Sequence, residues 1–183
     1  MQRVSIPPGI FDKIAKGDKN AFEELYRLTY KPLFAVILSW TKSQEDAKDI
    51  LQDTYVKIYK SSHLYKERGN PMAWIIKISR NLFLMKVRSE KTDLVDGAYE
   101  LKDYDISVNQ ISDADNRILI DQLFRHLGEE ERTIVVMHLI TGLKHREIAD
   151  ELNMPVGTVL SKYNRALKKL KEAVQKTKKG GTV

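Results

Sequence analysis

The sequence predicts an all-α protein with two small helical domains, the second of which contains a helix-turn-helix. Two observations lead to this fold class. Apolar residues recur at helical spacing in two basic parts of the chain, which are separated by an acidic stretch without periodicity. Near the C-terminus, two helical patterns flank a proline-containing break. With 183 residues, the chain is long enough for two domains with cores of their own.

Charge is distributed unevenly along the chain, whose net charge is +6. Residues 1–91 carry 17 Lys and Arg against 10 Asp and Glu, residues 92–117 carry 2 against 7, and residues 118–183 carry 12 against 8. Basic domains suit nucleic acid, although a solvated surface would explain either one alone. We expect a first domain at 1–91, an acidic flexible linker at 92–112 and a second domain at 113–183.

Polar capping residues mark the helix starts of the first domain. Asp18 and Ser43 can each accept a hydrogen bond from an amide of a first turn, and Asn70-Pro71 combines a cap with a proline at the first helical position. Apolar stripes follow each cap and are expected to form the core. They comprise Phe22, Leu25, Tyr26, Leu28, Leu33, Val36 and Ile37 in the first helix, Ala47, Ile50, Leu51, Thr54, Tyr55, Ile58 and Tyr59 in the second, and Trp74, Ile75, Ile78, Leu82 and Met85 in the third.

The helix after Ser43 also carries polar residues outside its apolar stripe. Asp46, Asp49, Gln52 and Asp53 lie within two turns of one another. Acids near a helix start interact favourably with the helix dipole, so ordinary helix stabilisation would explain them. In a basic domain, such a cluster also fits a docking face for a partner protein, which is the interpretation we favour.

A polar loop, Ser61 to Asn70, precedes the basic helix that begins at Pro71. Together they can hold single-stranded DNA, with cations on the phosphates and a pocket or ring for a base. The candidate residues are Ser61, Ser62, His63, Tyr65, Lys66, Arg68, Lys77, Arg80, Asn81, Lys86 and Arg88. In contrast, Tyr55, Tyr59 and Trp74 have core spacing, which favours packing over base stacking.

The helix-turn-helix is predicted from Lys144 onwards. Lys144–Leu152 forms a short helix, Asn153-Met154-Pro155 interrupts it, and a basic second helix follows with an apolar stripe from Val156 to Val174. Small, hydrogen-bonding or cationic side chains near the start of that helix suit entry into a major groove. They are Gly157, Thr158, Ser161, Lys162 and Arg165. An ordinary helical hairpin with a solvated polar face is the alternative.

Three further elements complete the prediction. A helix begins near Ser112, carries Ile118, Leu119, Leu123, Phe124 and Leu127, and ends at Gly128. Another helix spans Glu129–Ile140. The lysine-rich tail from Lys176 to Gly181 is expected to fray.

Several classes of function are excluded or disfavoured. The chain has no cysteine, which excludes disulfides and cysteine-based metal sites. No catalytic motif is present, and the histidines are scattered, so we expect no enzyme activity, cofactor or metal; a His138/His145 pair lacks a third ligand. The N-terminus lacks a signal-peptide pattern, and the most apolar run, Leu33–Trp40, is too short to span a bilayer. We expect a soluble cytoplasmic protein without membrane insertion.

Three segments in one order resemble the extracytoplasmic-function (group IV) sigma factors of bacterial RNA polymerase. Asp46–Tyr55 is similar to the acidic motif of their region two, and Ala73–Asn81 is similar to the Trp-containing helix that follows it. Arg146–Ala149, Pro155–Val159 and Arg165–Leu167 are similar to the region-four signature, although Lys162 stands where the family usually has arginine.

The resemblance implies roles for these residues. Asp49, Gln52 and Asp53 would dock on core RNA polymerase, the Ser61–Asn70 loop would capture a flipped base of the melted downstream promoter element, and the basic helix would contact its strand. The helix-turn-helix, including Arg146 and Glu147, would read the upstream element as duplex DNA. Such proteins are commonly held inactive by an anti-sigma factor.

Two rival functions remain open at this point. One is a conventional helix-turn-helix transcriptional regulator that acts without core polymerase. The other is a nucleic-acid-modifying enzyme with an unrecognised site, against which the lack of a catalytic cluster argues.

Overall fold

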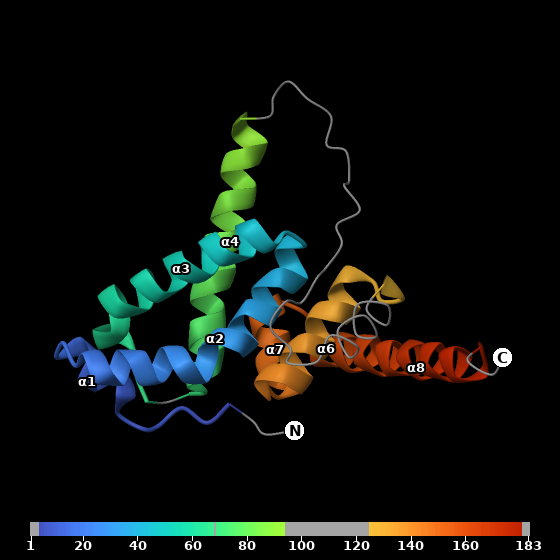
Figure 1. The fold of residues 1–183 in the computed structure, drawn as a ribbon, viewed down its shortest axis with the longest axis horizontal. Helices are drawn as coiled ribbons and strands as arrows, with labels where there is room; N and C mark the ends of the chain where they lie inside the picture. The colour runs from blue at the N-terminus through green and yellow to red at the C-terminus, as the bar shows by residue number, and fades with distance from the viewer. Residues whose placement is uncertain (1–3, 68, 94–124, 181–183) are drawn as a thin grey trace. The chain divides into compact units, whose positions relative to one another are not determined.

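The computed structural model describes residues 4–67, 69–93 and 125–180, and within these ranges every regular element is a helix (Figure 1). The described residues up to Asp93 belong to one compact unit and those from 125 onwards to a second. This confirms the predicted all-α fold class. The expected domain limits at 91 and 113 stay predictions.

The described part of the N-terminal unit contains four α-helices and one short 3-10 helix. They are α1 (Ile10–Ala15), α2 (Lys19–Thr41), α3 (Gln44–Ser61), η1 (Ser62–Leu64) and α4 (Pro71–Asp93). Helices α2, α3 and α4 pack against one another, and α1 packs on α2, α3 and η1. Fully buried branched side chains from several helices meet in the core, among them Leu25, Leu33, Ile37, Ile58 and Ile75.

The predicted capping residues start their helices. The Asp18 carboxylate accepts hydrogen bonds from the amides of Asn20 and Ala21, at 2.9 and 3.1 Å. Ser43 Oγ accepts from the Asp46 amide at 3.3 Å. The third cap, Asn70, accepts from the amide of Met72 at 3.0 Å, directly after Pro71. Each bond satisfies a donor that has no partner within its own helix.

The core face of α4 differs from the predicted one. Met85 is 64% exposed, whereas Met72, Ile76 and Ser79 are buried. The buried face of α4 is shifted by about one residue from the predicted face, which corresponds to a rotation of about 100° around the helix axis. Tyr59 on α3 was also placed in the core, and it is 48% exposed.

Helix α1 was not anticipated, because six residues are too few to show a clear period. Its apolar residues Ile10, Phe11 and Ile14 are each 2% exposed. Gly9 precedes the helix with φ 72°, a left-handed conformation that glycine adopts without a steric penalty. Tertiary packing, rather than intrinsic helix propensity, therefore holds this short helix.

The C-terminal unit contains α6 (Glu129–Thr141), α7 (His145–Leu152) and α8 (Val156–Gly180), all packed on one another. Gly128 precedes α6, and its amide donates a hydrogen bond to the Glu131 carboxylate at 3.0 Å. Helix α8 extends to Gly180, and fraying of the lysine-rich end stays a prediction. Most of the helix expected to start near Ser112 lies outside the described residues.

Candidate protein and nucleic-acid interfaces

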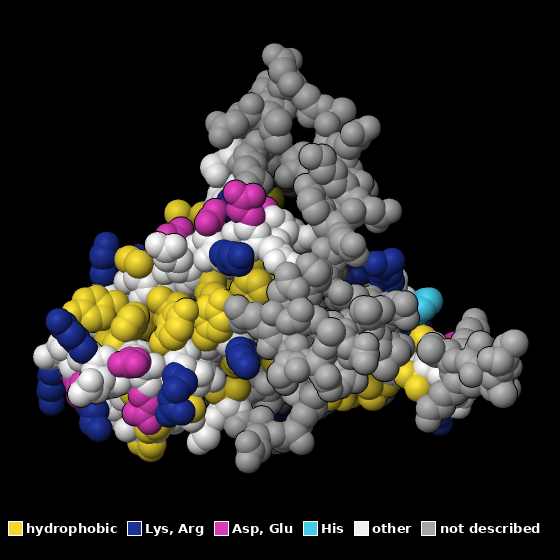
Figure 2. Space-filling model, viewed as in Figure 1, with side chains coloured by type: hydrophobic (Ala, Val, Ile, Leu, Met, Phe, Trp, Pro, Cys, Tyr) yellow, Lys and Arg dark blue, Asp and Glu magenta, His cyan; other side chains and the backbone are white. Residues whose placement is uncertain are grey.

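The three polar residues predicted to dock on a partner lie on the exposed face of α3. Asp49, Gln52 and Asp53 are all exposed, because positions separated by three and four residues share one side of a helix. Ala47 and Ile58 occupy the opposite face and are fully buried. Figure 2 shows acidic side chains above α3, next to a band of hydrophobic side chains over α2 and α3. We name Asp49, Gln52 and Asp53 the acidic ridge.

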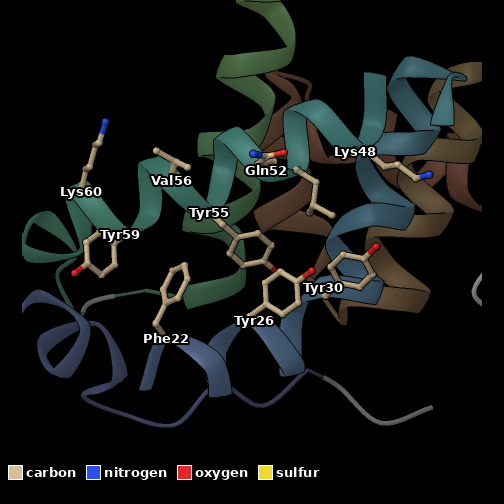
Figure 3. Close-up of a pocket in the computed structure, with 10 residues that line it drawn as sticks. Phe22, Tyr26, Tyr30, Lys48, Gln52, Tyr55, Val56, Tyr59 and Lys60 are labelled. Atoms are coloured by element: carbon tan, nitrogen blue, oxygen red, sulfur yellow. The ribbon is translucent and has the colours of Figure 1, made fainter. Parts of the chain in front are cut away.

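An aromatic groove lies between α2 and α3, with a volume of about 550 Å³ (Figure 3). Its lining residues are Phe22, Tyr26, Tyr30, Lys48, Leu51, Gln52, Tyr55, Val56, Tyr59 and Lys60. Phe22 faces Tyr55 and Tyr59 edge-on, at ring-centroid distances of 6.2 and 5.5 Å. Since Gln52 belongs to both features, the groove and the acidic ridge form one continuous surface.

One tyrosine of this groove is anchored in the core. Tyr55 is 5% exposed, and its hydroxyl lies 2.8 Å from Thr29 Oγ1, which donates in turn to the carbonyl of Leu25. Burial raises the pKa of Tyr55, although the Thr29 hydrogen bond opposes the rise. In contrast, Tyr26, Val56 and Tyr59 expose between 42 and 48% of their surface. The sequence alone does not reveal this groove, because the spacing of the aromatic residues on both helices predicts that they lie in the core.

The predicted base-capturing loop is shorter than expected. Helix α3 continues to Ser61 and η1 follows, so only the segment after Leu64 lacks helical structure. Ser62 is 1% exposed and donates a hydrogen bond to the carbonyl of Tyr59, which argues against its predicted contact with DNA. His63 and Lys66 are exposed. Arg68 lies outside the described residues.

Tyr65 is half-buried and packs against two other aromatic rings instead of standing free in the loop. Its ring centroid lies 4.3 Å from that of Phe11 and 5.2 Å from that of Trp74. Its hydroxyl donates to the carbonyl of Gly69 at 3.2 Å. Burial, with the negative charge of Glu67, raises the pKa of Tyr65. A DNA base could therefore stack only on the part of the Tyr65 ring that remains exposed.

The basic residues of α4 fall on two sides of the helix. Lys77, Asn81 and Arg88 share one face and are exposed. Arg80 is half-buried beside them. Lys86, which was predicted to join them, lies on the opposite face, where it forms an ion pair with Asp46 of α3.

The pairing with Lys86 shifts the pKa of Asp46. Burial disfavours the charged form of Asp46, but its hydrogen bonds with Lys86 and Ser43 outweigh that effect and lower the pKa of the carboxyl. The ammonium of Lys86 is thereby held on the protein. Its predicted contact with DNA would require this ion pair to open.

The helix-turn-helix forms where the sequence placed it. Asn153 ends α7 in a left-handed conformation, with φ 52° and ψ 46°, which asparagine tolerates better than most residues. The amides of Thr158 and Val159 donate to the carbonyl of Pro155, at 2.9 and 3.2 Å, and start α8. Glu147 accepts a hydrogen bond from the Lys144 amide at 2.7 Å. Glu147 therefore caps α7, a role different from its predicted contact with DNA.

The first turns of α8 present one polar face. Gly157, Ser161 and Arg165 are exposed on it, and Thr158 is half-buried at its edge. Lys162 forms an ion pair with Glu130 of α6, so its predicted contact with DNA would require this pair to open. From α7, Arg146 is exposed and Glu147 is half-buried.

A second ion pair joins α8 to α6 close by. Glu131 is 7% exposed and accepts a hydrogen bond from Lys169 Nζ at 2.7 Å. Burial opposes the ionisation of Glu131, but hydrogen bonds from Lys169 and the Gly128 amide, with the nearby charge of Arg165, lower the pKa of its carboxyl overall.

Two of the histidines predicted to be scattered lie together. The rings of His138 and His145 are stacked with centroids 4.2 Å apart, and Tyr163 contacts both edge-on. His138 Nδ1 lies 2.8 Å from the carbonyl of Leu143. Burial, then the neighbouring His138, lowers the pKa of His145. Among the described residues, no cluster of three His, Cys, Asp or Glu side chains could hold a metal ion.

No helix in the described ranges combines the length and apolar character that crossing a membrane requires. The described N-terminal unit thus offers the acidic ridge with its groove, a short loop and a basic face. The C-terminal unit offers a helix-turn-helix.

Family models match both units. Residues 25–92 match the model of sigma-70 region 2, and residues 117–170 match that of sigma-70 region 4. The chain is 26% identical to the ECF RNA polymerase sigma-E factor of Escherichia coli, over 91% of this chain and 93% of that protein. It is 24% identical to the corresponding sigma-E factor of Haemophilus influenzae, over 91% of this chain and 94% of that one.

Solved structures show the same fold. One is the sigma factor RpoE in complex with the anti-sigma factor NepR from Bartonella quintana, with a TM-score of 0.66, 22% identity, and coverage of 84% of this chain and 96% of that one. Another is CnrH in complex with the cytosolic domain of CnrY, with a TM-score of 0.60, 19% identity, and coverage of 91% and 95%.

The matched regions occur in the same order as the three sequence segments that first suggested this family. Sigma factors are transcription initiation factors rather than enzymes. The chain therefore belongs to the extracytoplasmic-function sigma factors, and it is an alternative sigma factor of RNA polymerase.

Proposed function

We propose that the acidic ridge and the aromatic groove together dock the protein on core RNA polymerase. The supporting observation is the exposure of Asp49, Gln52 and Asp53 on one face of α3, directly beside an apolar groove. Protein interfaces commonly combine an apolar centre, rich in aromatic side chains, with a polar rim. In this arrangement Tyr26 and Tyr59 would supply apolar contact area, and the carboxylates would set orientation and association rate.

The N-terminal unit holds the melted downstream promoter element. The exposed face of Lys77, Asn81 and Arg88 contacts the strand, while the segment from His63 to Asn70 receives an extruded base. Extruding a base costs a few kcal/mol, which contacts with the loop and with phosphates must offset. Lys86 contributes less to this contact than its sequence position suggests, because Asp46 holds it.

The C-terminal unit reads the upstream element as duplex DNA. The first turns of α8 enter the major groove, where Ser161 and Arg165 reach base edges and phosphates. Gly157 allows close approach of the backbone, because it has no side chain and no other part of the described chain crowds the position of a Cβ atom there. Each unit alone binds weakly, and the polymerase holds the two at a fixed distance.

An anti-sigma factor controls this activity in the cytoplasm. One of the solved structures described above is a complex of a sigma factor with an anti-sigma factor, and the other is CnrH in complex with the cytosolic domain of CnrY. An inhibitor that covers the acidic ridge and groove would prevent docking on the polymerase without touching DNA.

The docking proposal is tested by charge reversal. Asp49→Lys with Asp53→Lys is expected to weaken binding to core polymerase at least tenfold, roughly the cost of placing like charges in an interface. The matched control is Glu23→Lys with Glu24→Lys, which makes the same charge change on the exposed side of α2. Equal core affinity for the two double variants would refute the docking surface.

The DNA-melting proposal is tested separately. Asn81→Ala is expected to reduce open-complex formation more than it reduces core binding, since Asn81 is exposed on α4 whereas the acidic ridge belongs to α3. Permanganate reactivity of the melted strand measures the first quantity and a pull-down measures the second. Equal losses in both assays would contradict the assignment.

The family matches disfavour the alternative of a conventional transcriptional regulator that acts without core polymerase. Such a protein would bind duplex DNA tightly without polymerase. A gel shift with and without core enzyme separates the two, and we expect specific binding only when core enzyme is present.

A further inference from the structure

Helix α1 is tied to the loop that is proposed to capture the base. The amide of Gly9 donates a hydrogen bond to Oε1 of Glu67, although the two residues are 58 positions apart. The left-handed conformation of Gly9 positions its amide at the start of α1. Residues 9–15 lie outside the part of the chain that matches sigma-70 region 2, which begins at residue 25.

A cluster of three aromatic rings forms the second link between α1 and the loop. Phe11 of α1 is 2% exposed, and its ring centroid lies 4.3 Å from Tyr65 and 5.0 Å from Trp74. Tyr65 and Trp74 also contact each other edge-on at 5.2 Å. Because the Tyr65 hydroxyl bonds to the carbonyl of Gly69, the loop is fixed at both of its ends.

The outward side of the same segment is polar and exposed. His63, Leu64 and Lys66 face solvent, with Leu64 64% exposed. The contacts to α1 therefore hold the backbone from the inside and leave these side chains available to DNA. A binding loop that is already ordered loses less conformational entropy when it binds.

We propose that α1 braces the base-capturing loop, and that Glu67 and Phe11 are positioning residues for recognition of the melted strand. This inference rests on the proposed function of the loop. Glu67 acts through the Gly9 hydrogen bond and Phe11 acts through Tyr65, so neither needs to touch DNA.

The test compares Glu67→Ala with Glu67→Gln in the full chain bound to core polymerase. Both variants remove the negative charge, but glutamine retains an oxygen that can accept the Gly9 hydrogen bond. The probe is a single-stranded oligonucleotide that carries the downstream element of a promoter mapped by run-off transcription. Substituting each of its bases in turn measures the base preference.

Glu67→Ala is expected to lower affinity for the oligonucleotide, and its preference for the correct base, by about three- to tenfold, the range of one hydrogen bond. Glu67→Gln should stay within about twofold of the original protein. Core affinity should not change in either variant. The proposed brace would be overturned if Glu67→Ala kept the affinity and base preference of the original protein. It would also be overturned if both variants lost affinity and base preference equally.

A second variant addresses the aromatic cluster without emptying it. Phe11→Leu keeps most of the buried volume but removes the ring that contacts Tyr65. It should weaken the base preference and leave the midpoint of thermal unfolding nearly unchanged. Base preference equal to that of the original protein would overturn the role of Phe11. If the original protein itself shows no preference among bases, the proposed function of the loop fails instead.

Discussion

The two proposed DNA-reading elements of this protein are stabilised in opposite ways. The turn of the helix-turn-helix is held by local contacts, such as the amide of Met154 on the carbonyl of Ala149 and the amide of Thr158 on that of Pro155. The loop after η1 is held by residues distant in sequence, through Gly9 and Phe11. The conformation of the helix-turn-helix is therefore determined mainly by residues close in sequence. The conformation of the loop depends on the packing of α1 against it.

This difference predicts unequal responses to mutation, and the largest should come from the aromatic cluster. Phe11→Ala would leave a cavity beside Tyr65 and Trp74 and lower the stability of the N-terminal unit by about 3–5 kcal/mol. Hydrogen exchange followed by peptide should show faster exchange in α1 and the loop, and no change in α7 and α8. Faster exchange in α7 would contradict the independence of the two elements.

The reciprocal experiment removes a core side chain from the helix-turn-helix. Ile148 on α7 is fully buried, so Ile148→Ala should cost the C-terminal unit about 2–5 kcal/mol and reduce upstream duplex binding. Core binding should persist, because the acidic ridge belongs to the other unit. Loss of core binding in a pull-down would contradict the claim that docking on the polymerase does not depend on the C-terminal unit.

A smaller effect is expected at the turn itself. Asn153→Ala places an ordinary side chain at φ 52° and should destabilise the C-terminal unit by about 1–2 kcal/mol. Asn153→Gly should cost much less, because glycine adopts this conformation freely. Denaturant unfolding measures both, and equal losses would mean that the asparagine side chain, rather than the backbone conformation, matters.

The histidine pair predicts a pH dependence confined to the C-terminal unit. Because the pKa of His145 is lowered on folding, the unfolded chain binds a proton more readily than the folded one. His145 therefore imposes no stability penalty above its unfolded pKa of about 6.5, and stability falls as the pH drops below that value. Unfolding of α6 to α8 between pH 7.5 and about 5.5 should show this slope, and His145→Gln should flatten it.

The smallest effects are expected from the two interhelical lysines. Lys86 with Asp46 and Lys162 with Glu130 are partly exposed ion pairs, and double-mutant cycles should give about 0.2–1 kcal/mol for each. Removing the acid should free the lysine for DNA, so Glu130→Gln is expected to raise upstream duplex affinity slightly. Lower affinity would indicate that the pair orients α8.

The same contrast explains how much could be predicted from the sequence. Helix starts at Asp18, Ser43 and Asn70 were predicted because a cap acts within one turn. The turn at Asn153 was predicted for the same reason, since proline restricts its neighbour locally. Helical periodicity also placed Asp49, Gln52 and Asp53 on an exposed face.

The contacts that the sequence did not predict involve side chains whose environment is set by another helix. Lys86 and Lys162 look like free cations in the sequence, and each has an acidic partner at least 30 positions away. Burial of Ser62 depends on α1 and α3 packing around η1. The aromatic groove had a visible signal, since Phe22, Tyr26 and Tyr30 recur every four residues, but one helix cannot show which rings a neighbour covers.

Transcription with purified core polymerase tests the central claim most directly. Run-off products mapped over the genome of origin should begin at a defined set of start sites only when this protein is added. The set should disappear with Asp49→Lys and Asp53→Lys and persist with Glu23→Lys and Glu24→Lys. Failure of the unmodified protein, free of any inhibitor, to direct core polymerase to any start site would contradict its proposed action.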